Sequence, residues 1–169
     1  MDALNHFDTR TTNRLLRLEY LVGLVVSFYA LFTHLGEVNW WGFAFLFLYI
    51  DLIGYIPGAI AYRRSRTQRI SKVYYVLYNT MHSLATQSGV ALVWVLLGGP
   101  AWSLLALPIH LFGDRALFGN FLKPFGLGFE PVVHPAFAAL QKDVESASAS
   151  SSAAGARTGS VADQQPAVS

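Results

Sequence analysis

Four long apolar runs constrain this chain more than any other feature of its sequence. They cover residues 15–36, 40–62, 73–99 and 101–122. Each run exceeds the roughly 20 residues that an α-helix needs to cross the hydrocarbon core of a bilayer. The stretch FAFLFLYI in the second run is apolar on every side of a helix, so it has no face for water. The runs predict four transmembrane helices.

The composition supports a membrane protein over the alternative, a soluble helical protein with long buried helices. Hydrophobic residues make up 53% of the chain and charged residues 13%, with a mean hydropathy of +0.39. A soluble protein has about 25% charged residues to cover its surface. The chain has no cysteine, which excludes disulfides and thiolate metal sites. We therefore expect an all-α fold, a polytopic four-transmembrane-helix bundle.

The basic residues predict the orientation of the bundle. In a four-span arrangement all twelve lysines and arginines lie on one side, and the loops at 36–39 and 98–100 contain none. Lysine and arginine concentrate on the cytoplasmic side of membrane proteins. We expect a multi-pass protein of the inner (plasma) membrane with both termini cytoplasmic. The twelve residues are Arg10, Arg14, Arg17, Arg63, Arg64, Arg66, Arg69, Lys72, Arg115, Lys123, Lys142 and Arg157.

The bilayer itself is the partner that the sequence predicts. The basic loop between the second and third runs serves as a topology signal, and it can also contact anionic lipid head groups. We expect no nucleic-acid partner. The residues of that loop that would touch lipid are Arg63, Arg64, Arg66 and Arg69.

The chain changes character after the fourth run. Residues 123–137 are rich in proline and phenylalanine and are predicted to lie at the cytoplasmic interface, which completes a domain over 1–142. Residues 143–169 are rich in serine and alanine with almost no large apolar side chain. Such a segment cannot bury enough surface to offset the entropy cost of ordering, so a disordered tail is expected.

Four ionisable residues in the runs lie at a common predicted depth. With a rise of about 1.5 Å per residue, Asp51, His82, His110 and Asp114 lie roughly 12–18 Å from the cytoplasmic ends of their helices. Ionisable groups inside a membrane usually face the bundle interior. Two imidazoles and two carboxylates are a suitable ligand set for Zn²⁺, Fe²⁺ or Mn²⁺. The sequence predicts a divalent metal site with these four ligands.

Other polar residues have candidate roles around that site. Asn79 lies one turn before His82, and Tyr78 shares its helix face, so both are candidates for supporting a ligand or contacting substrate. Glu19 in the first run is a candidate ligand or base. The structural alternative is that the histidines and aspartates only join helices by hydrogen bonds, as polar groups in membrane bundles often do.

The motifs LLRLEYLVGL, YIDLIGYIPG, LYNTMHS and HLFGDRALFGNFLKPFGLGFEPVVH resemble those of a family of small bacterial four-helix integral membrane proteins of unknown function. The resemblance covers roughly residues 14–137. The family has no established activity, so the resemblance supports a functional site without naming a reaction. The positions that it carries over are Glu19, Asp51, Asn79, His82, His110, Asp114, Arg115 and His134.

A looser similarity connects the chain with membrane-bound metal-dependent hydrolases, through the intramembrane Asp51, the His82–Ser83 pair and the later His110 and Asp114. It favours metal-assisted hydrolysis of a lipid-like substrate, with Glu19, Asn79 and Arg115 as candidate catalytic residues. Two alternatives remain open from the sequence. One is a small proton- or ion-coupled transporter, and the other is a structural or partner-binding protein in which the cluster is polar packing.

Overall fold

The computed structural model describes residues 9–130 and 132–162, and these residues form helices and loops without a β-strand. The all-α class predicted from the sequence is confirmed for this part of the chain. The chain divides into two units, Met1–Glu130 and Pro131–Ser169. Each is described by itself below, and the four apolar runs all lie in the first.

The first two apolar runs form long helices. Helix α1 covers Arg10–Thr33, and the hydroxyl of Thr9 caps it by accepting a hydrogen bond from the Thr12 N–H. A short 3-10 helix, η1 (Leu35–Glu37), leads to α2 (Trp40–Gly54) and α3 (Ile56–Arg64). Backbone hydrogen bonds continue through Tyr55, so α2 and α3 are nearly one helix. By length and composition, Arg10–Thr33 and Trp40–Arg64 are the two described helices that can each cross a membrane.

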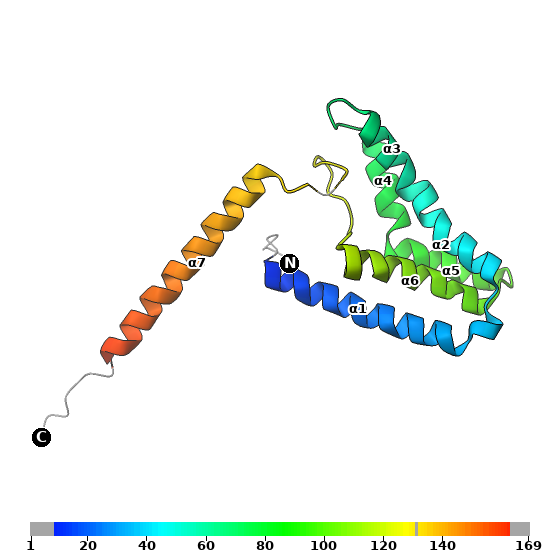
Figure 1. Cartoon of the computed structure of the whole chain (residues 1–169), viewed down its shortest axis with the longest axis horizontal. Helices are drawn as coiled ribbons and strands as arrows, with labels where there is room; N and C mark the ends of the chain where they lie inside the picture. The colour runs from blue at the N-terminus through cyan, green and yellow to red at the C-terminus, as the bar shows by residue number, and fades with distance from the viewer. Residues whose placement is uncertain (1–8, 131, 163–169) are drawn as a thin grey trace, which may run out of the picture. The chain divides into compact units, whose positions relative to one another are not determined.

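The third and fourth runs are interrupted, which differs from the continuous spans predicted over 73–99 and 101–122. The third divides into α4 (Lys72–Met81) and α5 (Leu84–Leu96), which leave their junction in different directions (Figure 1). The fourth divides into the 3-10 helix η2 (Ala101–Leu105), α6 (Ala106–Gly113) and a π-helical turn, η3 (Asp114–Phe118). Neither run therefore supplies a single helix of spanning length.

The helices of the first unit pack around α6 and α2. Helix α1 lies along α6 and η3, whereas α2 contacts both α4 and α6 (Figure 1). Leu46 and Ile50 of α2 are fully buried against Ala106 and Leu107 of α6. This packing brings the inner faces of α2, α6 and the α4–α5 junction together, and the site described below lies there.

Residues 119–130, here called the 119–130 segment, are irregular and are tied to α3 and α4. The Asn79 amide donates to the Lys123 carbonyl at 2.9 Å and accepts from the Lys123 N–H at 2.7 Å. The Tyr75 hydroxyl donates to the Leu127 carbonyl at 2.5 Å. Phe129 is buried against Gly58 of α3, where the absence of a side chain makes room for its ring.

The second unit contains helix α7 (Pro135–Ala162). Proline suits the first turn of a helix, and the His134 Nδ1 accepts a hydrogen bond from the Ala136 N–H. The structure thus gives helical backbone to residues 143–162, where the sequence predicts a disordered tail. Alanine has the highest helix propensity, which favours this backbone without tertiary packing. Residues 163–169 of the predicted tail lie outside the described residues.

The outward faces of the long helices are strongly apolar. Leu18, Val25 and Phe32 of α1 are exposed, as are Leu48 and Leu52 of α2. Soluble monomers rarely expose contiguous apolar patches larger than a few hundred Å². The first unit therefore exposes apolar side chains on the outer faces of α1 and α2, in addition to those that it buries in its core.

Candidate metal centre

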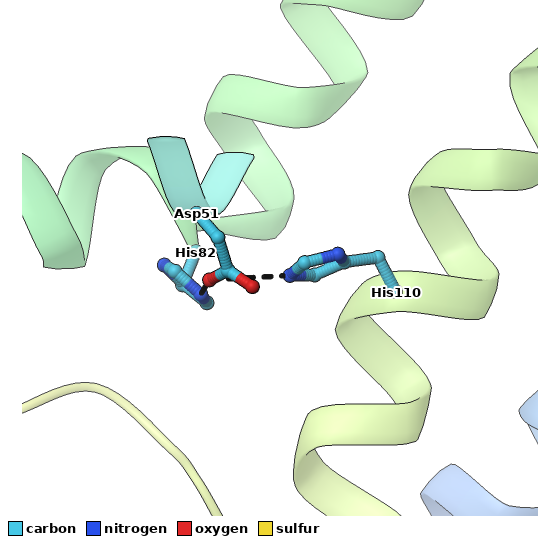
Figure 2. A group of neighbouring side chains, drawn as sticks. All are labelled: Asp51, His82 and His110. Atoms are coloured by element: carbon cyan, nitrogen blue, oxygen red, sulfur yellow. Dashed lines mark ion pairs between the residues drawn. The ribbon is translucent and has the colours of Figure 1, made fainter. Parts of the chain in front are cut away.

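Four side chains from three helical segments meet in the interior of the first unit. The Nε2 atom of His82 lies 3.3 Å from Asp51 Oδ1 and 3.3 Å from Asp114 Oδ2. The Nε2 atom of His110 lies 3.7 and 3.8 Å from the same two oxygens. Figure 2 shows Asp51, His82 and His110 pointing toward one another. The convergence that the predicted depths indicate is present in the structure.

Burial of the cluster is uneven. The two histidine side chains are each 4% exposed, whereas that of Asp114 is 19% exposed and that of Asp51 is 41% exposed. The cluster is therefore closed around the imidazoles and open on the Asp51 side. A catalytic metal site needs such an opening, because a water or substrate must reach the ion.

His82 is held in one orientation by its own helix. Its Nδ1 lies 3.0 Å from the Tyr78 carbonyl, and the Tyr78 ring stacks on the imidazole at a centroid distance of 3.9 Å. A proton on Nδ1 satisfies the carbonyl and leaves the Nε2 lone pair directed at the carboxylates. A hydrogen bond from the second ring nitrogen to a carbonyl is the usual support for a metal-binding histidine.

His110 is buried without a hydrogen bond to either ring nitrogen among the described residues. Phe47 packs edge-on against its ring at a centroid distance of 4.7 Å. Burying a polar group without a partner is costly, commonly about 1–3 kcal/mol. The Nε2 atom of His110 points into the space between the two carboxylates, so an ion at that position would satisfy it.

The spacing of the four atoms separates a metal site from a pair of ordinary ion pairs. Charge-assisted hydrogen bonds between nitrogen and carboxylate are about 2.7–2.9 Å long. Zinc bonds to nitrogen or oxygen are about 2.0–2.2 Å, so neighbouring ligand atoms of a tetrahedral site are roughly 3.3–3.6 Å apart. The nitrogen–oxygen separations here are 3.3–3.8 Å. These four separations are too long for strong hydrogen bonds and overlap the edge lengths of a zinc tetrahedron, whereas the ligand atoms of Asp51, His82 and His110 as a group lie within 4.8 Å of one another.

Two buried polar side chains support the break between α4 and α5. The Gln87 amide donates to the Met81 carbonyl at 2.6 Å, and its oxygen accepts from the Tyr49 hydroxyl. Arg115 donates to the His82 carbonyl at 3.0 Å and to the Tyr20 hydroxyl at 3.1 Å. The carbonyls of Met81 and His82 therefore have side-chain partners although the helix ends there.

Asp114 is the first residue of the π-helical turn η3. Two hydrogen bonds from the Arg17 guanidinium hold that turn to α1. Nε donates to the Ala116 carbonyl at 2.9 Å, and Nη2 donates to the Leu117 carbonyl at 2.7 Å. Single π-helical turns are rare and occur often at functional sites. Here the turn places the Asp114 carboxylate beside His82 as well as His110.

The three candidate catalytic residues do not reach the cluster with their side chains. Glu19 is exposed on α1 and is absent from the ligand group among the described residues. Asn79 binds the backbone of Lys123, and Arg115 binds the backbone of His82. His134 lies in the second unit at the start of α7. The geometry gives Asn79 and Arg115 contacts with the backbone, and their predicted catalytic roles stay predictions.

Sequence reasoning missed the partners that hold these groups in place. Tyr20 lies beside Arg115, with the Arg115 guanidinium 4.8 Å from its ring centroid. Lys123 donates to the Phe129 carbonyl at 2.5 Å, with the rings of Tyr78 and Phe129 near its ammonium. Burial is the main influence on the Lys123 amine and lowers its pKa, against the opposing pull of Glu130 and Asp114. Aromatic residues are too frequent in this chain for such partners to stand out in the sequence.

A comparison of the chain with protein-family models, with curated proteins and with solved structures found no match to any of them. The resemblance to a family of small four-helix membrane proteins therefore stays a prediction.

Proposed function

We propose that this chain is an integral membrane protein with four membrane-crossing segments and a divalent-metal centre that hydrolyses a lipid-like substrate. The observation that carries the proposal is the cluster of Asp51, His82, His110 and Asp114. Its nitrogen–oxygen separations of 3.3–3.8 Å are close to those of neighbouring ligand atoms around a divalent ion. The imidazole and carboxylate donors suit Zn²⁺, Fe²⁺ or Mn²⁺.

The exposed apolar faces support the membrane part of the proposal. Side chains such as Val25 and Leu52 are more than half exposed in the middle of long apolar helices. In a bilayer, lipid chains contact such faces directly, so no other protein element has to cover them. The interruptions in the third and fourth runs are compatible with a bilayer, because a broken helix is tolerated there when protein groups satisfy the freed backbone. Gln87 and Arg115 do this at the α4–α5 junction.

A divalent ion in this centre would act as a Lewis acid and would lower the pKa of a bound water to near neutrality. The chain's own residues supply the rest. His82 and His110 offer buried ring nitrogens, and Asp114 offers a largely buried carboxylate. With His82, His110 and Asp114 bound to the ion, a fourth coordination position would remain for water, and Asp51 at the open side of the cluster is placed to take a proton from that water. The apolar surroundings favour a substrate with acyl chains.

Metal content of the detergent-purified protein tests the centre. We expect a stoichiometric divalent ion in the unaltered protein and its loss in His82→Ala and His110→Ala. Each loss of affinity should exceed the roughly 10- to 100-fold effect of removing a supporting hydrogen bond. His34→Ala is the matched control, because His34 stacks on Trp102 away from the cluster. Its metal content should equal that of the unaltered protein.

The same preparations test the reaction. Incubation with a total membrane-lipid extract in mixed micelles should release a hydrolysed lipid, detected by mass spectrometry, only from the metal-loaded unaltered protein and the His34→Ala control. If the unaltered protein holds no stoichiometric metal and the histidine variants only lower its melting temperature, the cluster is polar packing. In that case the proposed function is wrong.

A further inference from the structure

We infer that Arg115 is a positioning residue for the metal centre, acting through the main chain of His82 and not through a substrate. The inference rests on the proposed metal centre. It assigns Arg115 a role that differs from the catalytic one predicted by resemblance. The contacts at the break between α4 and α5 carry it.

The break lies at a ligand residue. Helix α4 ends at Met81 and α5 begins at Leu84, so His82 and Ser83 lie between them. In an unbroken helix the His82 carbonyl would accept a hydrogen bond from the residue four positions later. Instead it accepts from the Arg115 guanidinium at 3.0 Å. The Arg115 guanidinium thus replaces a main-chain hydrogen bond of the helix at His82, the residue whose ring is a proposed ligand of the ion.

The geometry around Arg115 is restrictive. The side chain is buried, with 7% exposure for the residue. Its guanidinium spans from the His82 carbonyl to the Tyr20 hydroxyl on α1 at 3.1 Å, and the Tyr20 ring lies 4.8 Å from its central carbon. A planar guanidinium holds two acceptors at a set distance, which a flexible lysine ammonium does not do.

Arg115 also follows a second ligand directly in the sequence. Asp114 contributes its carboxylate to the cluster while the next residue holds the main chain of His82. Asp114 and Arg115 are neighbours in η3, so the position of this turn affects the distance between the Asp114 carboxylate and the His82 imidazole. A metal site tolerates errors of only about 0.5 Å in such separations.

Loss of the guanidinium should disturb the centre before it unfolds the protein. The His82 carbonyl would be buried without its partner, and the junction would relax toward another backbone path. The imidazole is attached to the main chain that would move, so its contacts with Tyr78 of α4 and its place in the cluster would both be disturbed. Arg115 is thus coupled to ligand geometry, whereas an arginine with a purely structural role would affect stability alone.

Co²⁺ titration followed by visible absorption tests the inference on the full-length detergent-purified protein. The probe is Co²⁺ itself, because its bands report coordination geometry. We expect Arg115→Met to lower Co²⁺ affinity by about 10- to 100-fold and to change the band pattern. Arg115→Lys should recover part of the affinity, since an ammonium can still donate to the His82 carbonyl.

Ser103→Ala is the matched control. The buried Ser103 hydroxyl also joins two helical elements by a hydrogen bond to a backbone carbonyl, that of Asn39 at 2.8 Å, but neither residue is a ligand or adjoins one in the chain. This variant should lose stability while its Co²⁺ affinity and spectrum stay those of the unaltered protein.

Three results would overturn the inference. If Arg115→Met binds Co²⁺ with the affinity and spectrum of the unaltered protein, Arg115 does not position the centre, although the proposed function stands. If Arg115→Met and Ser103→Ala both lose affinity in proportion to their loss of melting temperature, the effect is general destabilisation. Failure of the unaltered protein to bind Co²⁺ would reject the proposed function and this inference together.

Discussion

At the scale of single residues, Gly54 controls the space available to the ring of His82. A Cβ atom at this position would lie 2.8 Å from the Met81 Cβ and 3.2 Å from both Cε1 and Nδ1 of His82. The first distance is shorter than atoms tolerate, so either α2 or the α4–α5 junction would have to move. The absence of a side chain on α2 is therefore part of what orients a candidate ligand on another helix.

Gly54→Ala is predicted to weaken the metal centre. Overpacking in a filled interior costs about 1–3 kcal/mol, and here the displaced group carries the imidazole. We expect lower metal content after purification together with a lower melting temperature. Gly89→Ala provides the control, because a Cβ there meets no atom within 4 Å on a helical backbone. Its metal content should not change, and its stability should stay the same or rise by up to about 1 kcal/mol. Equal metal content in both variants would contradict the prediction.

The depths of polar residues were readable from the sequence, whereas their partners were not. Helical rise and topology indicate that Asp51, His82 and His110 lie at a similar level, and their side chains do meet. Glu19, which the sequence suggests as a further ligand or base, is exposed on α1. The sequence gives the position of a residue along its helix axis. The direction in which its side chain points depends on how the helices pack, and only the structure shows that direction.

At the scale of secondary-structure elements, the breaks in the third and fourth runs were the main departure from the predicted spans. No glycine or proline lies at positions 82 and 83, so no local signal marks the end of α4. The break depends on side chains that satisfy the freed carbonyls, and one of them, Arg115, belongs to a different run. A helix end that is stabilised by a tertiary contact cannot be located from the sequence around it.

Asn79 belongs to this scale, because its amide joins the 119–130 segment to α4. It both donates to and accepts from the backbone of Lys123. Asn79→Leu keeps a similar volume and removes both bonds, which should lower the free energy of unfolding by about 1–3 kcal/mol. Amide hydrogen exchange should become faster in the 119–130 segment.

Metal content separates this role from a catalytic one. Asn79 makes no contact with the ligand atoms among the described residues, so Asn79→Leu should keep the metal content of the unaltered protein. Loss of lipid hydrolysis with unchanged melting temperature and unchanged exchange would instead favour the catalytic role predicted from the sequence.

At the scale of the whole molecule, composition and the placement of charged residues were the most informative sequence features about the class of protein. The all-α class followed from four long apolar runs, and the helices of the first unit bear it out. Two described helices are long enough to cross a membrane by themselves, and the same property occurs in core helices of soluble proteins. What argues against a soluble core is that the apolar side chains of α1 and α2 lie largely outside. The proposal of membrane insertion therefore rests on the exposed apolar surface of α1 and α2 as well as on helix length.

The proposed orientation can be measured directly, because the chain has no native cysteine. Gly36→Cys lies between the first two apolar segments, where an added Cβ meets no atom within 4 Å. Thr67→Cys lies in the exposed basic loop between α3 and α4. The concentration of arginine in that loop predicts that it faces the cytoplasm.

A membrane-impermeant maleimide applied to intact cells should therefore label Gly36→Cys and should label Thr67→Cys only after permeabilisation. Extraction of both variants by detergent, but not by alkaline carbonate, serves as the control for membrane insertion. Labelling of Thr67→Cys alone in intact cells would reverse the orientation. Labelling of both only after permeabilisation, with release by carbonate, would place the apolar faces of α1 and α2 against another protein instead of lipid. The metal centre would then open to a protein interface, and a lipid-like substrate would lose its main physical support.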